Sequence, residues 1–317
     1  MKGRLRYNTD GNWYKGNVHI HSNCSDGLLD YKQIAQLYTR AGYDFIFVTD
    51  HNHTSTIEDL DNLPLLAING VEIHGKDEYG SFFHVVGLDF SIPLPDKISF
   101  LEALRMLNSN NAITILAHPH WSGNSLSDAL RHDFDGIEIY NHLCHWLNGK
   151  SHGLFLWDHM LERNPNILGF SVDDAHMLPE QPWWNGGWIV VNTESLDREN
   201  IVTAIREGNF YSTQEPEFKK IEIRGSKLYV ETSYVQAIRL VGPKWRGRRV
   251  FAREGKGINK AEFTIESADH YLRIEMKIST AKGLGQIISS GDTSKGNRYQ
   301  DIALYMYMCG LKMIKKA

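Results

Sequence analysis

The stretch that decides the fold is Asn17-Val18-His19-Ile20-His21-Ser22-Asn23-Cys24-Ser25-Asp26-Gly27. His19 and His21 alternate at the end of an apolar strand, so their imidazoles project to the same face. Two imidazoles placed in this way can bind one metal ion. A His-x-His pair in a strand is nevertheless common without a metal, so its meaning depends on the polar residues elsewhere in the chain.

Composition restricts the classes to which the chain can belong. Its 317 residues can form one large α/β barrel or a barrel with a small second domain, and we favour the second. The formal net charge of −4 gives no general attraction to nucleic acid or to anionic membranes. No signal peptide or long apolar stretch is found, which predicts a cytoplasmic protein with no membrane partner. The three scattered cysteines argue against a disulfide framework.

Strand-like and helix-like segments alternate through the first two hundred residues, which predicts βα units around a mainly parallel sheet. A first strand ends at His21, and further strands are expected over residues 45–48, 65–73, 82–88, 112–117, 136–140, 167–172 and 187–191. Helices are expected from an N-cap at Asp30 to Gly42, and over residues 98–108, 154–163 and 198–207. We interpret residues 1–215 as an α/β barrel domain.

From about residue 218 the pattern changes to short alternating strands. In residues 272–277 apolar and charged side chains alternate strictly, as a half-buried antiparallel strand requires. Similar signals occur at residues 221–223, 228–230, 238–241 and 263–265. Residues 216–317 are therefore predicted to form a small antiparallel β domain, with a short amphipathic helix over residues 299–317.

Polar residues gather at the C-terminal ends of the predicted barrel strands, the edge at which active sites form in barrels of βα units. They are His19, His21, Asp26, Asp50, His51, Glu72, His118, Asp174 and His176, and His84 opens the strand that follows Glu72. Each has a plain structural explanation by itself: His84 can be a core histidine, Asp26 a turn residue and Asp50 a cap. Six or seven strand ends that each carry a histidine or a carboxylate together predict a metal cluster. Fourteen of the 15 histidines also lie between His19 and His176.

This pattern resembles the PHP (polymerase and histidinol phosphatase) superfamily of metal-dependent phosphoesterases. His19-x-His21 with Ser25-Asp26-Gly27 resembles its first motif, and Thr49-Asp50-His51 its second. Glu72, His84, Ala117-His118-Pro119 and Asp174-Ala175-His176 follow in the family's order, within roughly residues 16–215. The resemblance implies a distorted (β/α)7 barrel followed by a small C-terminal β domain.

The resemblance also implies two or three divalent metal ions. His19, His21, Glu72 and Asp174 would hold the first ion, and Glu72, His84 and His118 the second, with Glu72 bridging. Asp26, His51 and His176 would serve a third. The family usually has serine where this chain has Asp173, so a contact beside the ligands differs. Mixed imidazole and carboxylate ligands favour Zn²⁺, Mn²⁺ or Fe²⁺ over Mg²⁺.

The expected reaction is hydrolysis of a phosphate ester of a small metabolite, a nucleotide or sugar phosphate, or of a short oligonucleotide. A metal-activated hydroxide would attack phosphorus, and His176 or His142 would protonate the leaving group, with Asp50 as a further catalytic candidate. Candidates for substrate binding are Trp183, Trp184, His120 and Asn141. The two tryptophans can stack on a base or sugar, or can simply pack with Trp188 at the barrel rim.

Two other functions stay open at this point. An amidohydrolase-like enzyme acting on an amide or cyclic ester also begins with His-x-His. The Ser25-Asp26-Gly27 continuation and the lack of an obvious metal-bridging lysine favour the phosphoesterase instead. A non-catalytic metal-binding scaffold is less consistent with a nearly full ligand set. The sequence leaves the oligomeric state open.

Overall fold

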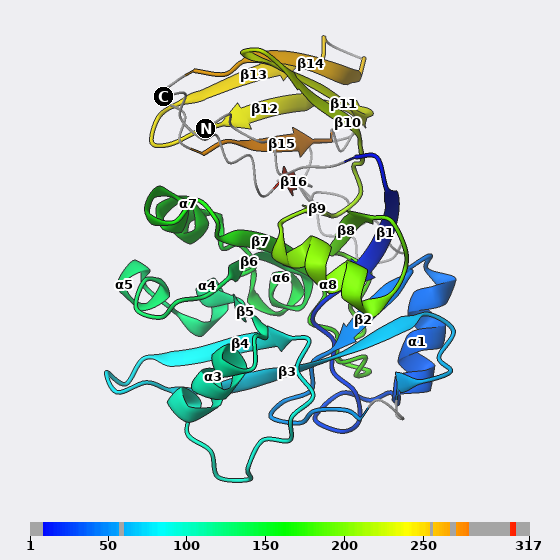
Figure 1. Cartoon of the computed structure of the whole chain (residues 1–317), viewed down its shortest axis with the longest axis vertical. Helices are drawn as coiled ribbons and strands as arrows, with labels where there is room; N and C mark the ends of the chain where they lie inside the picture. Colours follow the sequence, from blue (N-terminus) through cyan, green and yellow to red (C-terminus); the bar gives the residue numbers. More distant parts are fainter. Residues whose placement is uncertain (1–8, 57–59, 254–255, 267–270, 279–304, 309–317) are drawn as a thin grey trace, which may run out of the picture.

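The computed structural model describes residues 9–56, 60–253, 256–266, 271–278 and 305–308. Figure 1 shows two parts, a barrel of strands with helices around it and, above it in that view, a domain made of strands. The labelled helices and the strands β1 to β9 belong to the barrel, whereas β10 to β15 form the second part.

The barrel is built from seven strands that neighbour one another in chain order. They are β1 (Asn12–Asn17), β2 (Phe45–Val48), β3 (Leu66–Lys76), β4 (Phe82–Leu88), β5 (Ile113–Leu116), β6 (Gly136–Asn141) and β7 (Leu168–Val172). Just beyond β1 and β7 the ring closes, because the His21 amide donates to the Ala175 carbonyl and the Asp174 amide to the His19 carbonyl, each at 3.0 Å. This confirms the predicted distorted barrel, and the closure places His19, His21 and Asp174 side by side.

β1 ends at Asn17 rather than at His21. Asn17 is buried, and its Oδ1 accepts the His19 amide at 3.2 Å, which interrupts the backbone ladder that β1 makes with its neighbours. The chain pairs again as a single bridge between Ile20 and Ala175. The interruption shortens the strand without removing His19 and His21 from the barrel edge.

At the other end of the barrel two further strands separate β1 from β7. β8 (Trp188–Thr193) pairs antiparallel with β1, and β9 (Phe210–Thr213) pairs with β8. The Ser212 hydroxyl joins β9 to β7, since it accepts from the Ser171 amide at 3.0 Å and donates to the Gly169 carbonyl at 2.7 Å. The sheet of β1 to β9 is therefore nearly closed at both ends.

The barrel sheet is mainly parallel, as predicted, but β4 runs in the opposite direction. It forms an antiparallel hairpin with β3 and also pairs antiparallel with β5. This reversal accounts for His84, which lies near the start of β4 and opposite His74 of β3. A residue at the start of an antiparallel strand meets residues at the ends of parallel strands, so His84 joins Glu72 at the same edge.

Seven helices are described in the barrel. They are α1 (Tyr31–Arg40), α3 (Phe100–Ser109), α4 (Pro119–Ser122), α5 (Leu126–Ala129), α6 (His142–Asn148), α7 (Leu154–Arg163) and α8 (Arg198–Arg206). Asp30 caps α1 in a capping box with Gln33, as its position predicts, and Gly42 beyond the helix has a φ of 76°. The short helix α6 is not among the predicted helices. Among the described residues, no helix has both the length and the apolar character needed to cross a membrane.

The C-terminal β domain consists of two layers around its own apolar core. One layer is β10 (Phe218–Arg224), β11 (Lys227–Val235) and β14 (Ile258–Thr264), and the other contains β12 (Ala237–Val241), β13 (Gly247–Phe251) and β15 (Arg273–Lys277). Leu228 and Phe263 of the first layer and Ile238 and Ile274 of the second are buried in this core.

The C-terminal segment differs from the predicted helix. Residues Tyr305–Met308 form strand β16, which pairs with β15 on one side and with β9 on the other. The rest of residues 299–317 lies outside the described residues. Through β16 the barrel sheet continues into the second layer of the β domain. Pairing between strands distant in sequence fixes these four residues, so local periodicity could not reveal it.

Candidate metal centre

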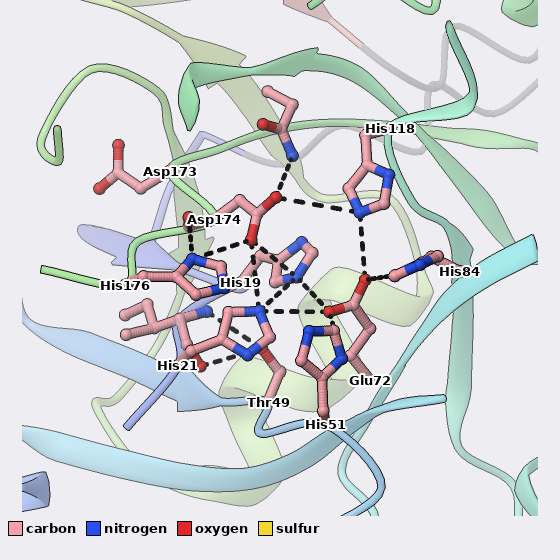
Figure 2. A network of polar contacts seen from close by, with 12 residues as sticks. His19, His21, Thr49, His51, Glu72, His84, His118, Asp173, Asp174 and His176 are labelled. Carbon is pink, nitrogen blue, oxygen red and sulfur yellow. Dashed lines mark hydrogen bonds and ion pairs between the residues drawn. The ribbon is translucent and has the colours of Figure 1, made fainter. Parts of the chain in front are cut away.

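Four ligand atoms meet where the barrel closes, as Figure 2 shows. His19 Nε2 lies 3.1 Å from His21 Nε2, 3.1 Å from Glu72 Oε2 and 3.4 Å from Asp174 Oδ1. His21 Nε2 lies 3.2 Å from the same Glu72 and Asp174 oxygens. Ligands placed about 2.0–2.1 Å from a zinc ion in a tetrahedron are separated by about 3.3 Å. The five spacings given above are therefore compatible with one ion bound by these four atoms.

Glu72 presents its other carboxylate oxygen to a second group of ligands. Glu72 Oε1 lies 2.8 Å from His84 Nδ1 and 3.1 Å from His118 Nε2. His118 Nε2 is also 3.9 Å from Asp174 Oδ2. Because the two oxygens of one buried carboxylate face two different sets of nitrogens, Glu72 has the arrangement of a ligand that bridges two ions.

A third group lies on the solvent side of the first two. Asp26 Oδ2 is 3.5 Å from His51 Nε2 and 3.4 Å from His176 Nε2, and Asp26 Oδ1 is 3.6 Å from His21 Nδ1. The resemblance did not imply His21 in this third set. A neutral imidazole has one unprotonated nitrogen, so His21 can serve only one of the two groups at a time.

The composition of the cluster fits cations. The buried Nδ1 of His21 has no hydrogen-bond partner. In the described part of the chain, Glu72 and Asp174 form their ion pairs with histidines, not with lysine or arginine. Buried carboxylates without a permanent cation are costly, and metal ions bound by the surrounding imidazoles would balance them.

The pKa values show the same demand for positive charge. Burial lowers the pKa of His19, but the carboxylates of Asp174, Glu72 and Glu138 raise it more, so it lies well above its ordinary range. Burial lowers the pKa of His21, but hydrogen bonds that its ring can donate to Asp174 and Glu72 outweigh this effect and raise the pKa to about 9. Burial alone would raise the pKa values of Glu72 and Asp174, yet the charge of His19 contributes to holding both well below their usual range.

Glu138 supports the ligands and is absent from the residues singled out in the sequence. Its Oε1 lies 2.6 Å from His19 Nδ1, and its Oε2 accepts the His118 amide at 2.7 Å. Asn141 donates through Nδ2 to both Glu138 Oε2 (2.9 Å) and Asp174 Oδ2 (3.1 Å). Glu138 and Asn141 thus orient three candidate ligands. The signal in the sequence is an acidic residue in the middle of an otherwise apolar strand, β6, where burial needs a partner.

Asp50 does not face the ligand cluster. Its carboxylate accepts from the Ser22 amide and from the hydroxyls of Ser22 and Ser25, each at 2.7 Å, and from the Tyr31 hydroxyl at 3.3 Å. These bonds fix the turn that carries Asp26. The structure therefore gives Asp50 a role in positioning this loop.

Asp173, at the position where the resemblance implies a serine, also organises a loop. Its carboxylate accepts from the amides of Asn185, Gly186 and Gly187 at 2.9, 2.8 and 3.1 Å, and from the Tyr38 hydroxyl at 2.9 Å. Figure 2 shows its side chain turned away from the ligand cluster while Asp174 points into it. Asp173 therefore supports the loop, and its carboxylate lies outside the cluster of candidate ligands.

His142 lies beside the rim with both ring nitrogens engaged. Its Nδ1 is 2.9 Å from the Tyr140 hydroxyl, and its Nε2 accepts from Trp146 Nε1 at 3.2 Å. The ring packs on Gly186, where a Cβ atom would come within 2.1 Å of Nδ1. His142 is thus a packed residue behind the site.

The tryptophans predicted at the rim pack against other aromatic side chains. Trp183 stacks on Trp146 with ring centroids 6.1 Å apart, and Trp184 meets the edge of Tyr38 at 5.3 Å. His120 is exposed on α4. Asn141 holds Glu138 and Asp174 rather than facing solvent.

A pocket of about 260 Å³ opens above the ligand cluster. Seven of the residues that line it are candidate ligands, namely Asp26, His51, Glu72, His84, His118, Asp174 and His176. The other lining residues are Trp121, Leu143, Cys144, Leu147, Leu178 and Gln181. Trp183, Trp184, His120, His142 and Asn141 are outside this lining. The structure thus brings seven of the nine predicted metal ligands to the lining of one pocket, with His19 and His21 buried, and leaves the predicted substrate-binding residues outside it.

Known proteins share parts of this sequence. A 5'-3' exoribonuclease from Haemophilus influenzae is 28% identical over 105 residues, which is 32% of this chain and 38% of that enzyme. The match thus spans well under half of the curated relative. No protein-family model matches the chain.

Structure comparison gives one match that supports the fold and one that is too weak to do so. An amidohydrolase from Chromobacterium violaceum with bound sulfate and no metal is 16% identical, covers 62% of this chain and 96% of its own, and has a TM-score of 0.40, too low to support an argument. A two-domain protein from Bacteroides vulgatus that contains a predicted PHP-like metal-dependent phosphoesterase is 14% identical, and the match covers 88% of this chain and 92% of that one with a TM-score of 0.55. The chain therefore has the fold of a two-domain PHP-like protein, as its motifs predicted.

Proposed function

We propose that this protein hydrolyses a phosphate ester in a metal-dependent reaction. The substrate would be a small phosphorylated metabolite, such as a nucleotide or sugar phosphate, or a short oligonucleotide. The observation that carries the proposal is Glu72, whose two oxygens each face a separate set of nitrogens at the floor of an open pocket. The PHP-like fold is consistent with this chemistry.

Two or three ions of Zn²⁺, Mn²⁺ or Fe²⁺ fit these donor sets. His19, His21, Glu72 and Asp174 would hold the first. Glu72, His84 and His118 would hold the second, and Asp26, His51 and His176, which lie together with His21, the third. Such ions, when bound, neutralise charge on the phosphate and lower the pKa of water towards neutrality. Burial lowers the pKa of His51 to about 4, so this side chain is already unprotonated and ready to act as a ligand near pH 7.

Hydrolysis requires the chain to position the ester and to deliver one proton. Oxygen from water forms a bond to phosphorus, the bond from phosphorus to the ester oxygen breaks, and the departing alkoxide takes up the proton. Of the two proposed proton donors, His176 lines the pocket and His142 does not. His176 cannot both hold an ion through Nε2 and donate a proton from that atom. With two ions bound His176 is the proton donor, and with three it is a ligand.

The test is phosphate release from p-nitrophenyl phosphate, nucleotides and short oligonucleotides by protein loaded with Mn²⁺ or Zn²⁺. We expect release with loaded protein and loss of it in His19→Ala and Asp174→Ala. A p-nitrophenyl ester of a carboxylic acid and an amide substrate serve as controls for general metal-dependent hydrolysis. If none of the phosphate esters is cleaved in a metal-dependent manner, the proposal fails.

A further inference from the structure

The residues that line the pocket above the candidate metal centre are of two kinds. Seven are histidines and carboxylates, which we call the floor, and the others are apolar apart from Gln181, which we call the apolar wall. Trp121 of the apolar wall adjoins the floor, with its ring edge-on to His84 and His118 at centroid distances of 5.9 and 5.2 Å. The remaining atoms of a group held at the floor would therefore meet the apolar residues of the same pocket.

The apolar wall comes mainly from α6. Leu143 and Leu147 are four residues apart and so lie on one face of the helix, next to Cys144. Leu147 is 41% exposed and Trp121 is 38% exposed, although the wall around them is otherwise well covered. Large apolar side chains left open beside a polar cluster indicate a surface for an apolar group of a ligand.

Charge in the pocket restricts that ligand further. No lysine or arginine is found among the described residues that line the pocket. Metal ions at the floor can balance one phosphate group, but a second anionic group would lie against leucine and tryptophan with no cation to compensate its lost hydration. A basic groove, which single-stranded nucleic acid binding uses, is likewise missing from this lining.

Building on the phosphoesterase function proposed above, we infer that the preferred substrate is a phosphate ester whose organic group is aromatic or alkyl and carries no second anionic group. Trp121, Leu143, Leu147 and Leu178 contact this organic group. The inference narrows the substrate class, because it disfavours oligonucleotides, bisphosphates and polyhydroxylated sugar phosphates.

The first test compares esters that release similar leaving groups from Mn²⁺-loaded protein. 2-Phenylethyl phosphate and glycerol 3-phosphate both release a primary alkoxide, so a difference reports on recognition. We expect kcat/KM for 2-phenylethyl phosphate to be at least about tenfold higher. The kcat/KM for a nucleoside 5′-monophosphate should likewise exceed that for the corresponding 3′,5′-bisphosphate. Equal or reversed preferences would overturn the inference while leaving metal-dependent phosphate release, and hence the proposed function, intact.

The second test changes the wall itself. Leu147→Ala should raise KM for 2-phenylethyl phosphate about five- to tenfold, with little change in kcat and little change for glycerol 3-phosphate. Leu147→Arg should shift the preference towards the bisphosphate. Leu196→Ala is the control, because it removes a leucine of similar exposure, 39%, outside the pocket. It should change neither the preference for 2-phenylethyl phosphate over glycerol 3-phosphate nor that for the monophosphate over the bisphosphate. Metal content is measured for each variant. If Leu147→Ala keeps its metal and the ratio of the two esters is unchanged, the inference is wrong.

Discussion

The barrel edge and the C-terminal β domain balance buried charge in different ways. In the β domain, buried Arg273 donates to Glu275 in its own strand and to Asp158 of α7. At the barrel edge, Glu72 and Asp174 pair with histidines alone among the described residues. Arginine keeps its charge at every physiological pH, whereas histidine can give up its proton to make room for a metal ion.

Because of this difference, the barrel edge is suited to metal-dependent chemistry, whereas the ion pairs of the β domain stabilise its fold. A permanent cation beside Glu72 would compete with metal for the carboxylate, so its absence keeps the site available. Chelators, pH and substitutions of ligands should therefore affect the barrel edge strongly and the β domain hardly at all.

The largest effect should come from removing a ligand that faces two histidines. Asp174→Ala should lower kcat/KM by about a thousandfold or more, because loss of an ion removes several kcal/mol of charge stabilisation. Steady-state kinetics measures the loss of activity, and metal analysis of the same preparation measures the loss of bound ions. Glu231→Ala, which breaks an exposed pair with Lys260 in the β domain, is the control and should retain full activity. If Asp174→Ala and Glu231→Ala had comparable activity, the barrel edge would matter no more for activity than the β domain, and the prediction would be wrong.

A smaller effect should follow from changing the residue that orients the ligands. Glu138→Gln keeps the shape of the side chain but removes the charge facing His19 Nδ1. We expect metal affinity to fall about ten- to a hundredfold, and activity at limiting metal to fall in parallel. Excess metal should restore part of the activity. Unchanged metal affinity would show that Glu138 only supports packing.

The pH dependence of stability should differ between the chelated and the loaded protein. Folding raises the pKa of His21 from 6.5 to about 9, so the stabilisation it contributes is complete below pH 6.5 and is lost as pH rises through about 9. The midpoint temperature of thermal unfolding of the chelated protein should accordingly decrease as the pH is raised from 6.5 to 9. Metal-loaded protein should not show this decrease, because bound ions already keep the ligands unprotonated. A chelated protein equally stable across this range would contradict the assignment of positive charge to the cluster.

The smallest effect is expected in the β domain. Lys260→Ala removes an exposed partner of Glu231 and should leave the free energy of unfolding almost unchanged. Denaturant titration with and without chelator measures this. A larger loss, or one that depends on the chelator, would show that the two regions are coupled.

The sequence was sufficient to group the candidate ligands because parallel strands end at one edge of a barrel. His19, His21, Glu72 and Asp174 could be grouped from strand ends alone, and the structure brings the other three side chains within 3.4 Å of His19 Nε2. That they bind a metal stays a prediction. The same reasoning could not find Glu138, since its function depends on which strands neighbour β6. The direction of β4 and the pairing of β16 are likewise set by distant partners.

Substrate recognition was harder to predict for a related reason. Trp183 and Trp184 are close to the last motif in sequence, but they pack against Trp146 and Tyr38. The pocket wall comes instead from α6, a helix of seven residues with little periodicity to detect. Candidate metal ligands can be recognised in a sequence by residue type. Apolar residues of a pocket wall look like core residues until the fold shows which of them line an open pocket.

We propose that the barrel edge binds several ions that together cleave a phosphate ester. The decisive measurement titrates chelated protein with Mn²⁺ while phosphate release from p-nitrophenyl phosphate is recorded. We predict no release without metal and a rise that saturates between two and three equivalents per chain. Saturation at one equivalent, or no metal-dependent release, would contradict this proposal.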